Sequence, residues 1–216
     1  MGRVASVQVG TLAPLPGPGK PAQSGIDKRP VREGAHLRQG GVEGDSIGKP
    51  EIHGGPDQAV LLFAASHYPR FESRLGRTLP PGSFGENLTV EGLDDATVAI
   101  GDVYRVGGAE IQVTWPRGPC GSLARFLADP GIIDAIGSPQ RAGWYARVLV
   151  EGRVRPGDPI TLVSRTAPEW TVERAARVRR DETDVEGARA LVRVEGLSAK
   201  GRENLSKRFA PAEATS

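Results

Sequence analysis

The chain has 216 residues, of which 38% are hydrophobic and 25% charged, and its formal net charge is only +2. These values are typical of a folded globular protein. They argue against a disordered chain, and against nucleic acid or an anionic membrane as the main partner. We find no charged-then-apolar leader and no apolar run long enough to span a bilayer, so we expect a cytoplasmic protein.

Short apolar runs bounded by Gly, Asp or Pro recur along the first three quarters of the chain. The 29 glycines and 18 prolines indicate many turns between these runs. The first run spans residues 4–9 and stops at the Pro/Gly-rich residues 14–21. We expect further strands at residues 59–63, 98–100, 103–106, 111–114, 145–150 and 160–163. Many short strands at close spacing predict a sandwich or a barrel.

Two helices are expected among these strands. One follows Ser66 and runs toward Gly76, with Pro69 tolerated in its first turn. The other begins near Cys120, where a proline-rich turn gives way to an apolar run, and it ends by Pro130.

After about Thr166 the apolar residues recur with helical spacing. We expect three short helices. Their N-caps should be Thr171, Asp184 and Ser198, and Gly196 should end a helix. The residues expected on their buried faces are Val172, Ala175, Ala176, Val185, Ala188, Leu191, Val192, Leu205 and Phe209. Because short helices are marginal alone, they should dock on each other or on the strands. The sequence thus predicts a β domain over residues 1–165 and a three-helix unit over residues 166–216.

The only cysteine of the chain, Cys120, ends the segment Pro116-Arg117-Gly118-Pro119-Cys120. A lone cysteine cannot close an intramolecular disulfide. A helix N-terminus and the nearby Arg117 favour its thiolate, the form that nucleophilic chemistry or a soft metal requires. The alternative is a buried and inert cysteine, because free cysteine is among the most buried residue types.

Two glycine-dense loops have the composition of ligand-binding segments. The first combines residues 43–45 with residues 53–57, and the second covers residues 81–88. Their glycines allow the backbone to approach a ligand and to present N–H groups to an anion, while His53 and Asn87 can fix its orientation. Ordinary turn formation also explains either loop.

Several other kinds of site find little support in the sequence. The spacing of His36, His53, His67 and Cys120 matches no compact zinc module. Walker A and GxGxxG fingerprints are missing, which leaves nucleoside triphosphates and nicotinamide dinucleotides unsupported. A serine hydrolase is disfavoured as well, because the chain has no GxSxG nucleophile elbow.

Taken together, these segments resemble the MOSC domain family, named after the C-terminal domain of molybdenum cofactor sulfurases. The resemblance rests on Glu43-Gly44-Asp45, His53-Gly54-Gly55-Pro56-Asp57, Pro81-Gly82-Ser83-Phe84-Gly85-Glu86-Asn87-Leu88-Thr89, Ile100-Gly101-Asp102 and Pro116-Arg117-Gly118-Pro119-Cys120. Within the family, the chain is similar to stand-alone bacterial proteins linked to resistance against 6-N-hydroxylaminopurine. Those proteins share the Gly143-Trp144-Tyr145 stretch and a three-helix tail, so the resemblance covers nearly the whole chain.

The resemblance implies a mainly β, mixed barrel that binds a molybdenum cofactor of the pterin type. Cys120 would be the catalytic residue and the metal ligand. The residues expected to bind the cofactor are His53, Gly54, Gly55, Asp57, Ser83, Phe84, Gly85, Glu86, Asn87, Arg117 and Pro119. Related proteins reduce small N-hydroxylated bases, amidoximes and hydroxylamines, and they take electrons from a separate flavin or haem reductase.

Three classes of function stay open at this point: an N–O reductase, a persulfide sulfur carrier and a non-enzymatic cofactor-binding module. Nothing in the chain indicates pyridoxal phosphate, flavin or NAD, and a homodimer is left open.

Two departures from the family pattern bear on substrate range. Trp115 stands where family members often have Gln, and Gln58 stands where they often have a basic residue.

Overall fold

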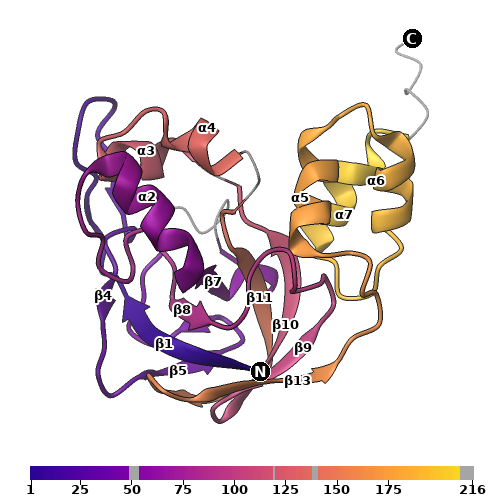
Figure 1. Cartoon of the computed structure of the whole chain (residues 1–216), viewed down its shortest axis with the longest axis horizontal. Helices are drawn as coiled ribbons and strands as arrows, with labels where there is room; N and C mark the ends of the chain where they lie inside the picture. Colours follow the sequence, from indigo (N-terminus) through magenta and orange to yellow (C-terminus); the bar gives the residue numbers. More distant parts are fainter. Residues whose placement is uncertain (49–53, 119, 138–140, 210–216) are drawn as a thin grey trace.

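The computed structural model describes residues 1–48, 54–118, 120–137 and 141–209. Around its central ring (Figure 1), the strands are β1 (Gly2–Val9), β8 (Leu88–Glu91), β7 (Val60–Ala64), β11 (Trp144–Val150), β10 (Ala109–Pro116), β9 (Val103–Val106) and β13 (Pro159–Ser164). The sheet closes because β13 pairs with β1, placing Ile160 opposite Gly2. Neighbours in the ring are antiparallel except β7 and β8, which are parallel. The mainly β, mixed-barrel class is therefore confirmed.

Shorter strands extend the ring. β4 (Arg29–Pro30) pairs with the end of β1. A small separate sheet contains β5 (Ala35–Arg38), β6 (Gly41–Val42) and β12 (Gly152–Val154), and β2 (Ala13–Pro14) pairs with β3 (Gln23–Ser24). Most of these elements have only two or three residues, which is too short for an alternating pattern to reveal them.

The expected strand at residues 98–100 is wrong. Those residues are fully buried, but they form a loop whose only strand-like pairing is an isolated bridge between Ala99 and Thr171. The loop is held by Asp102, whose buried carboxylate accepts hydrogen bonds from the Ala99 N–H and from Arg165. An apolar run of three residues marks burial here rather than strand geometry.

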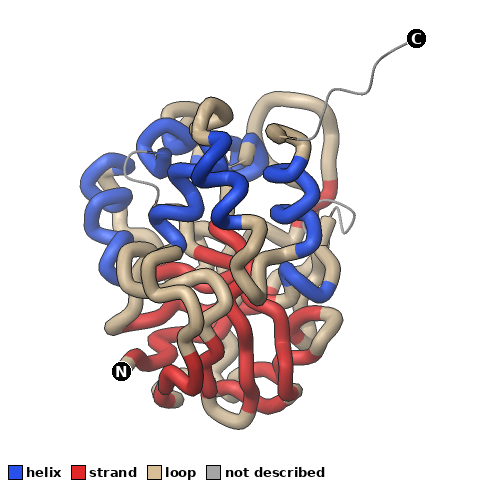
Figure 2. Tube along the Cα trace, turned by 90° about the vertical axis from the view of Figure 1, so that its right-hand side faces the viewer, coloured by secondary structure: helices blue, strands red, loops and turns tan. Residues whose placement is uncertain are grey.

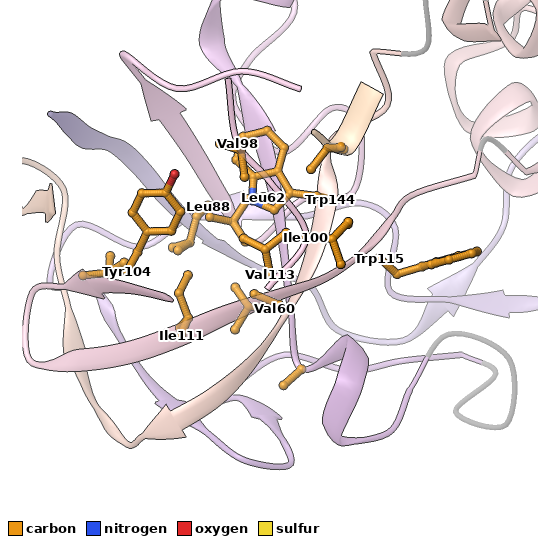
Figure 3. Close-up of a cluster of buried hydrophobic side chains, with 14 of the residues drawn as sticks. Val60, Leu62, Leu88, Val98, Ile100, Tyr104, Ile111, Val113, Trp115 and Trp144 are labelled. Atoms are coloured by element: carbon orange, nitrogen blue, oxygen red, sulfur yellow. The ribbon is translucent and has the colours of Figure 1, made fainter. Parts of the chain in front are cut away.

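The barrel interior is filled by the inward-facing side chains of the ring strands. Trp144 is the largest of these side chains and is only 1% exposed. Figure 3 shows it among Leu62, Val98 and Ile100, while Trp115 points away from this group. Alternation along the strands produces this core, because every second side chain of a strand faces the interior.

Three helices on one side of the barrel build a second core. They are α2 (Tyr68–Leu75), α3 (Gly121–Leu127) and α4 (Ile132–Gly137), and the helices gather together above the strands in Figure 2. The first two were expected, with a proline in the first turn of α2 and Gly76 in the left-handed conformation at its end. The sequence did not indicate α4. Phe63 and Phe84 stack at the centre of this core with ring centroids 4.3 Å apart.

The three helices expected after Thr166 are present as α5 (Val172–Arg180), α6 (Val185–Leu191) and α7 (Ala199–Ser206). All three expected N-caps are confirmed: Thr171, Asp184 and Ser198 each accept a hydrogen bond from a backbone N–H three residues on. The prediction that Gly196 ends a helix is wrong. α6 ends at Leu191, and Gly196 instead forms a turn with φ 89° where Gly101 approaches it closely.

Whether residues 1–165 fold without these helices remains a prediction. Across the described ranges, no helix is both long enough and apolar enough to cross a membrane.

α7 packs directly on the barrel through a glycine, which leads to a stability prediction. A Cβ added to Gly201 would lie 2.6 Å from two ring atoms of the buried Trp115. Gly201→Ala should therefore lower the free energy of unfolding by about 1–2 kcal/mol, although alanine is the better helix former by about 1 kcal/mol. Gly121→Ala is the control for thermal melting, because an added Cβ there meets nothing within 4 Å. Equal melting temperatures for both variants would contradict this packing.

Candidate functional site

One cavity of about 510 Å³ collects residues from most of the segments singled out in the sequence. Its wall comes from residues 24–28, 38–48 and 58–61, from the loop before β8, from the segment that ends at Cys120, and from Tyr145 on β11. Gly85, Asn87, Arg117 and Cys120 all line it. Loops that are distant in the sequence thus converge on the cysteine.

Cys120 lies at the N-cap of α3, as the sequence predicts, with an extended φ of −136°. Its backbone carbonyl accepts a hydrogen bond of 3.0 Å from the N–H of Leu123. The thiol is free and half-buried, with one side on the cavity and the other packed on the second core. It is therefore within reach of a ligand in the cavity, and it is not fully buried.

Arg117 is buried beside Cys120 with an exposed fraction of only 5%. Its backbone N–H donates to the carbonyl of Gly143 at 3.0 Å, which fixes the turn. Its Nη1 is buried and has no hydrogen-bond partner among the described residues. A buried guanidinium normally requires an acidic or phosphate partner, so this atom is a candidate contact for an anionic ligand.

The two carboxylates that might have paired with Arg117 are used elsewhere. Asp57 forms an ion pair with Arg147 at 2.9 Å and also accepts from the backbone N–H of Ala199 at 2.7 Å. Asp57 therefore connects the barrel to α7 instead of lining the cavity. Glu86 is completely buried in a separate hydrogen-bond network. The Arg117 side chain thus has no ion-pair partner in the part of the chain that the structure describes.

Glu86 holds together the turn before β8. Its carboxylate accepts hydrogen bonds from the Tyr68 hydroxyl, from the N–H groups of Gly82 (3.0 Å) and Phe84 (3.1 Å), and from the Thr89 hydroxyl at 2.8 Å. With four donors around it and no exposed surface, Glu86 stabilises the turn and does not line the cavity. Burial of the Tyr68 phenol raises the pKa of that hydroxyl, and the neighbouring charge of Glu86 adds to the shift.

Phe84 and Ser83 also do not line the cavity. Phe84 belongs to the second core, where it stacks on Phe63. The Ser83 hydroxyl donates to the carbonyl of Pro80 at 2.6 Å. The loop over residues 81–88 therefore contributes Gly85 and Asn87 to the cavity, and its other candidate residues shape the turn.

Lys28 and Asp45 form a buried ion pair on the cavity wall, and sequence analysis missed Lys28. Its ammonium donates to both oxygens of Asp45. Asn87 Nδ2 donates to Asp45 Oδ2 at 2.9 Å, while Asn87 Oδ1 accepts from the N–H of Leu61 at 3.1 Å. Burial lowers the pKa of Lys28, and the charge of Asp45 opposes that shift. In the sequence Lys28 stands between two other charged residues and looks like an exposed turn.

Tyr145 completes the wall beside Arg117 and Cys120. Burial raises the pKa of its hydroxyl, and the neighbouring guanidinium of Arg117 opposes this shift. Gln58 lines the cavity, whereas Trp115 does not and packs against α7 instead. Gly54 and Gly55 lie before the short helix η1 (Pro56–Gln58) and also do not line the cavity. His53 and Pro119 lie outside the described residues.

Metal ligation by several protein side chains finds no candidate in the described ranges. No group of three or more His, Cys, Asp and Glu side chains there could hold a metal ion. His67 bonds to Asp95 through Nε2 at 2.8 Å, remote from the cavity wall, and His36 lies on β5. Any metal at Cys120 would therefore have to arrive with further ligands of its own.

Sequence comparisons relate this chain to known proteins. A family model described as MOSC domain matches residues 49–161. The protein YflK of Bacillus subtilis is 37% identical over 206 residues, covering 95% of this chain and 93% of YflK. A Gibberella moniliformis protein named "Reductase" is 35% identical over 136 residues, covering 59% of this chain and 24% of that protein.

A solved structure extends the likeness to three dimensions. The crystal structure of YiiM from Geobacillus stearothermophilus has a TM-score of 0.83 and 30% sequence identity, covering 97% of this chain and all of that one. The similarity thus includes the barrel and the three C-terminal helices. Together with the family-model match, it shows that this chain belongs to the MOSC domain family, a family associated with the molybdenum cofactor.

Proposed function

We propose that this protein is a molybdenum-cofactor-dependent reductase of small N-hydroxylated compounds, with Cys120 as the metal ligand and a separate reductase as electron donor. The observation that carries the proposal is the presence, in one cavity, of a free thiol and of a buried guanidinium whose Nη1 has no hydrogen-bond partner among the described residues. A soft thiolate suits a molybdenum centre, and a guanidinium with a free N–H group suits a phosphate.

The side chains present fit such a cofactor. Because the metal would come bound to its pterin, the protein needs to add only one ligand, and Cys120 is the one thiol in the chain. Arg117 Nη1 would hold the phosphate of the pterin. Gly85, whose φ of 74° turns the backbone beside Asn87, packs closely against Ile26 on the same wall. A volume of about 510 Å³ is within the range of small-molecule and cofactor sites.

When bound, the cofactor would supply a redox metal that passes electrons to the substrate. The overall reaction converts R–NHOH, two electrons and two protons into R–NH₂ and water, so the N–O bond breaks and its oxygen leaves as water. The chain offers Lys28 Nζ as a proton-bearing group on the wall, held in place by Asp45. No flavin or nicotinamide motif is found in the sequence, and the electrons would therefore come from a partner protein.

Relatives support reduction as the reaction class. The Gibberella moniliformis protein is named "Reductase", and its match with this chain covers 24% of its length. The name of that protein supports the reaction class and does not indicate the electron donor of this chain.

The direct test is metal analysis of protein made in a cofactor-competent host, followed by a turnover assay. Holo-protein supplied with reduced methyl viologen should bind molybdenum and convert a hydroxylaminopurine or an amidoxime to its amine. Protein that lacks molybdenum but accumulates a persulfide on Cys120 would overturn the proposal in favour of sulfur transfer. Molybdenum binding without any turnover would favour a non-enzymatic binding module.

Cofactor retention should depend on the shape of the Arg117 side chain as well as on its charge. Arg117→Lys keeps the charge but loses the planar fork that contacts a phosphate through two N–H groups. We expect about tenfold weaker retention of molybdenum during gel filtration, with the circular dichroism spectrum unchanged. Arg105→Lys is the control, because Arg105 is an exposed β9 residue paired with Glu110. Equal metal content in both variants would count against the phosphate role.

A further inference from the structure

The C-terminal helices place a second arginine beside the Cys120 segment. Arg179 lies in the last turn of α5, and its guanidinium packs against Gly118. A Cβ added to Gly118 would be 2.4 Å from Arg179 Nη1 and 3.0 Å from Nη2. Gly118 itself lines the cavity, so the guanidinium of Arg179 lies immediately behind the cavity wall.

The charge of Arg179 is not neutralised within the described structure. No described carboxylate acts on its side chain, and the group that does is the hydroxyl of Tyr145. Burial lowers its pKa, and a neighbouring Tyr145 hydroxyl opposes that shift. Arg117, Cys120 and Tyr145 line the same cavity as Gly118, against which Arg179 packs. Two arginines thus lie beside the thiol, while the cavity carboxylates Asp45 and Glu43 are paired with Lys28 and Arg38.

We propose that Arg179 supplies the second positive charge of an anion site built by Arg117 next to Cys120, and that the site takes a phosphate group. Arg117 would contact the anion through its free Nη1. The positive charge of Arg179 would attract the anion across Gly118 without touching it. Assignment of the anion to the cofactor rests on the proposed function. The positive potential at Cys120 does not, because it follows from the positions of the two guanidinium groups.

This inference gives Gly118 a specific role. Its backbone does not adopt a positive φ, so the conformation does not require glycine. The requirement is space, since any side chain would displace the guanidinium that rests on it. Gly118→Ala therefore moves the charge of Arg179 away from the wall without removing a charge from the protein.

The lone cysteine permits a test on the full-length chain without any cofactor. Protein from a host that makes no pterin cofactor is alkylated with anionic iodoacetate and with neutral iodoacetamide, and the ratio of the two rates reports the potential at Cys120. Arg179→Gln should lower this ratio by about three- to tenfold, as expected for the loss of one nearby charge. Arg177→Gln is the matched control, because it removes the same charge from an exposed position of the same helix.

The Gly118→Ala variant shows whether the effect at Cys120 comes from the position of the Arg179 charge or from a change of fold. It should lower the same ratio, and combining it with Arg179→Gln should add little, because both changes act on one guanidinium. Inorganic phosphate should slow iodoacetate in the wild type and much less in Arg179→Gln. If Arg179→Gln changes the two rates by the same factor, or no more than Arg177→Gln does, the anion site is excluded even when the protein binds molybdenum.

The source of the phosphate can be resolved in the holo-protein. If the cofactor provides it, Arg179→Gln should retain several-fold less molybdenum while KM values for free base and nucleotide substrates shift equally. If the substrate provides it, molybdenum content should stay unchanged, and KM should rise for a hydroxylaminopurine nucleotide but not for the free base. Unchanged metal content together with unchanged KM values would overturn the phosphate assignment.

Discussion

Cys120→Ser should reduce molybdenum-dependent reduction of a hydroxylaminopurine by at least about a hundredfold, since even outer residues of metal sites cost up to that factor. The serine hydroxyl is protonated at neutral pH and is a hard oxygen donor, whereas the thiolate is a soft ligand. The structure places this sulfur on the cavity wall at the start of α3, so the change acts at the site itself. Turnover with reduced methyl viologen, expressed per bound molybdenum, is the measurement.

The same experiment distinguishes ligation from a packing effect. Cys120→Ala retains the small apolar contact with the second core but offers no ligand. Both variants should melt within a few degrees of the wild type, because one half-buried side chain contributes little to stability. A Cys120→Ser protein that carries its cofactor and turns over at the wild-type rate would exclude thiolate ligation.

Glu86→Ala should destabilise the protein by about 3–5 kcal/mol, the largest stability effect that we expect from a single polar residue. The alanine leaves four donors without their acceptor: two backbone N–H groups and the hydroxyls of Tyr68 and Thr89. For a domain of this size, such a loss lowers the melting temperature by roughly 10 °C. Urea unfolding followed by tryptophan fluorescence measures the change directly.

Glu91→Ala is the matched control for this prediction. Glu91 ends the same strand, β8, and pairs with Arg3 at an exposed position. Exposed ion pairs contribute less than about 1 kcal/mol, so this variant should unfold close to the wild type. If Glu86→Ala proves as stable as Glu91→Ala while losing its cofactor, Glu86 would be a ligand-binding residue instead of a turn residue.

Elements with a long apolar pattern could be predicted from the sequence, and elements without one could not. Strands such as β9 and β10, and the caps of α5, α6 and α7, follow from alternation and from side chains that accept hydrogen bonds. β5 alternates apolar and polar residues, but it is only four residues long, which is too short for the alternation to stand out. The buried loop at residues 98–100 has the opposite problem, because burial makes it as apolar as a strand.

Only some residues of the candidate site could be predicted from the sequence. The convergence of Asn87, Arg117 and Cys120 on one cavity was expected, and the structure places them there. Glu86 and Asp57 could not be told apart from ligand-binding residues, because a carboxylate in a glycine-rich loop has the same composition whether it binds a ligand or closes a turn. Lys28 and Arg179 depend on tertiary contacts with residues far along the chain, and local sequence carries no signal of those contacts.

Closure of the barrel through Gly2 and Ile160 sets an order of events during synthesis. The two residues can pair only after nearly three quarters of the chain has left the ribosome, and contacts so distant in sequence form late in folding. The cavity wall combines residues from Ser24 to Glu151, with Arg179 behind it, so no nascent fragment that ends before Arg179 contains the complete site. A ligand of this cavity therefore meets a finished protein, and its loading depends on delivery to the folded chain rather than on capture during translation.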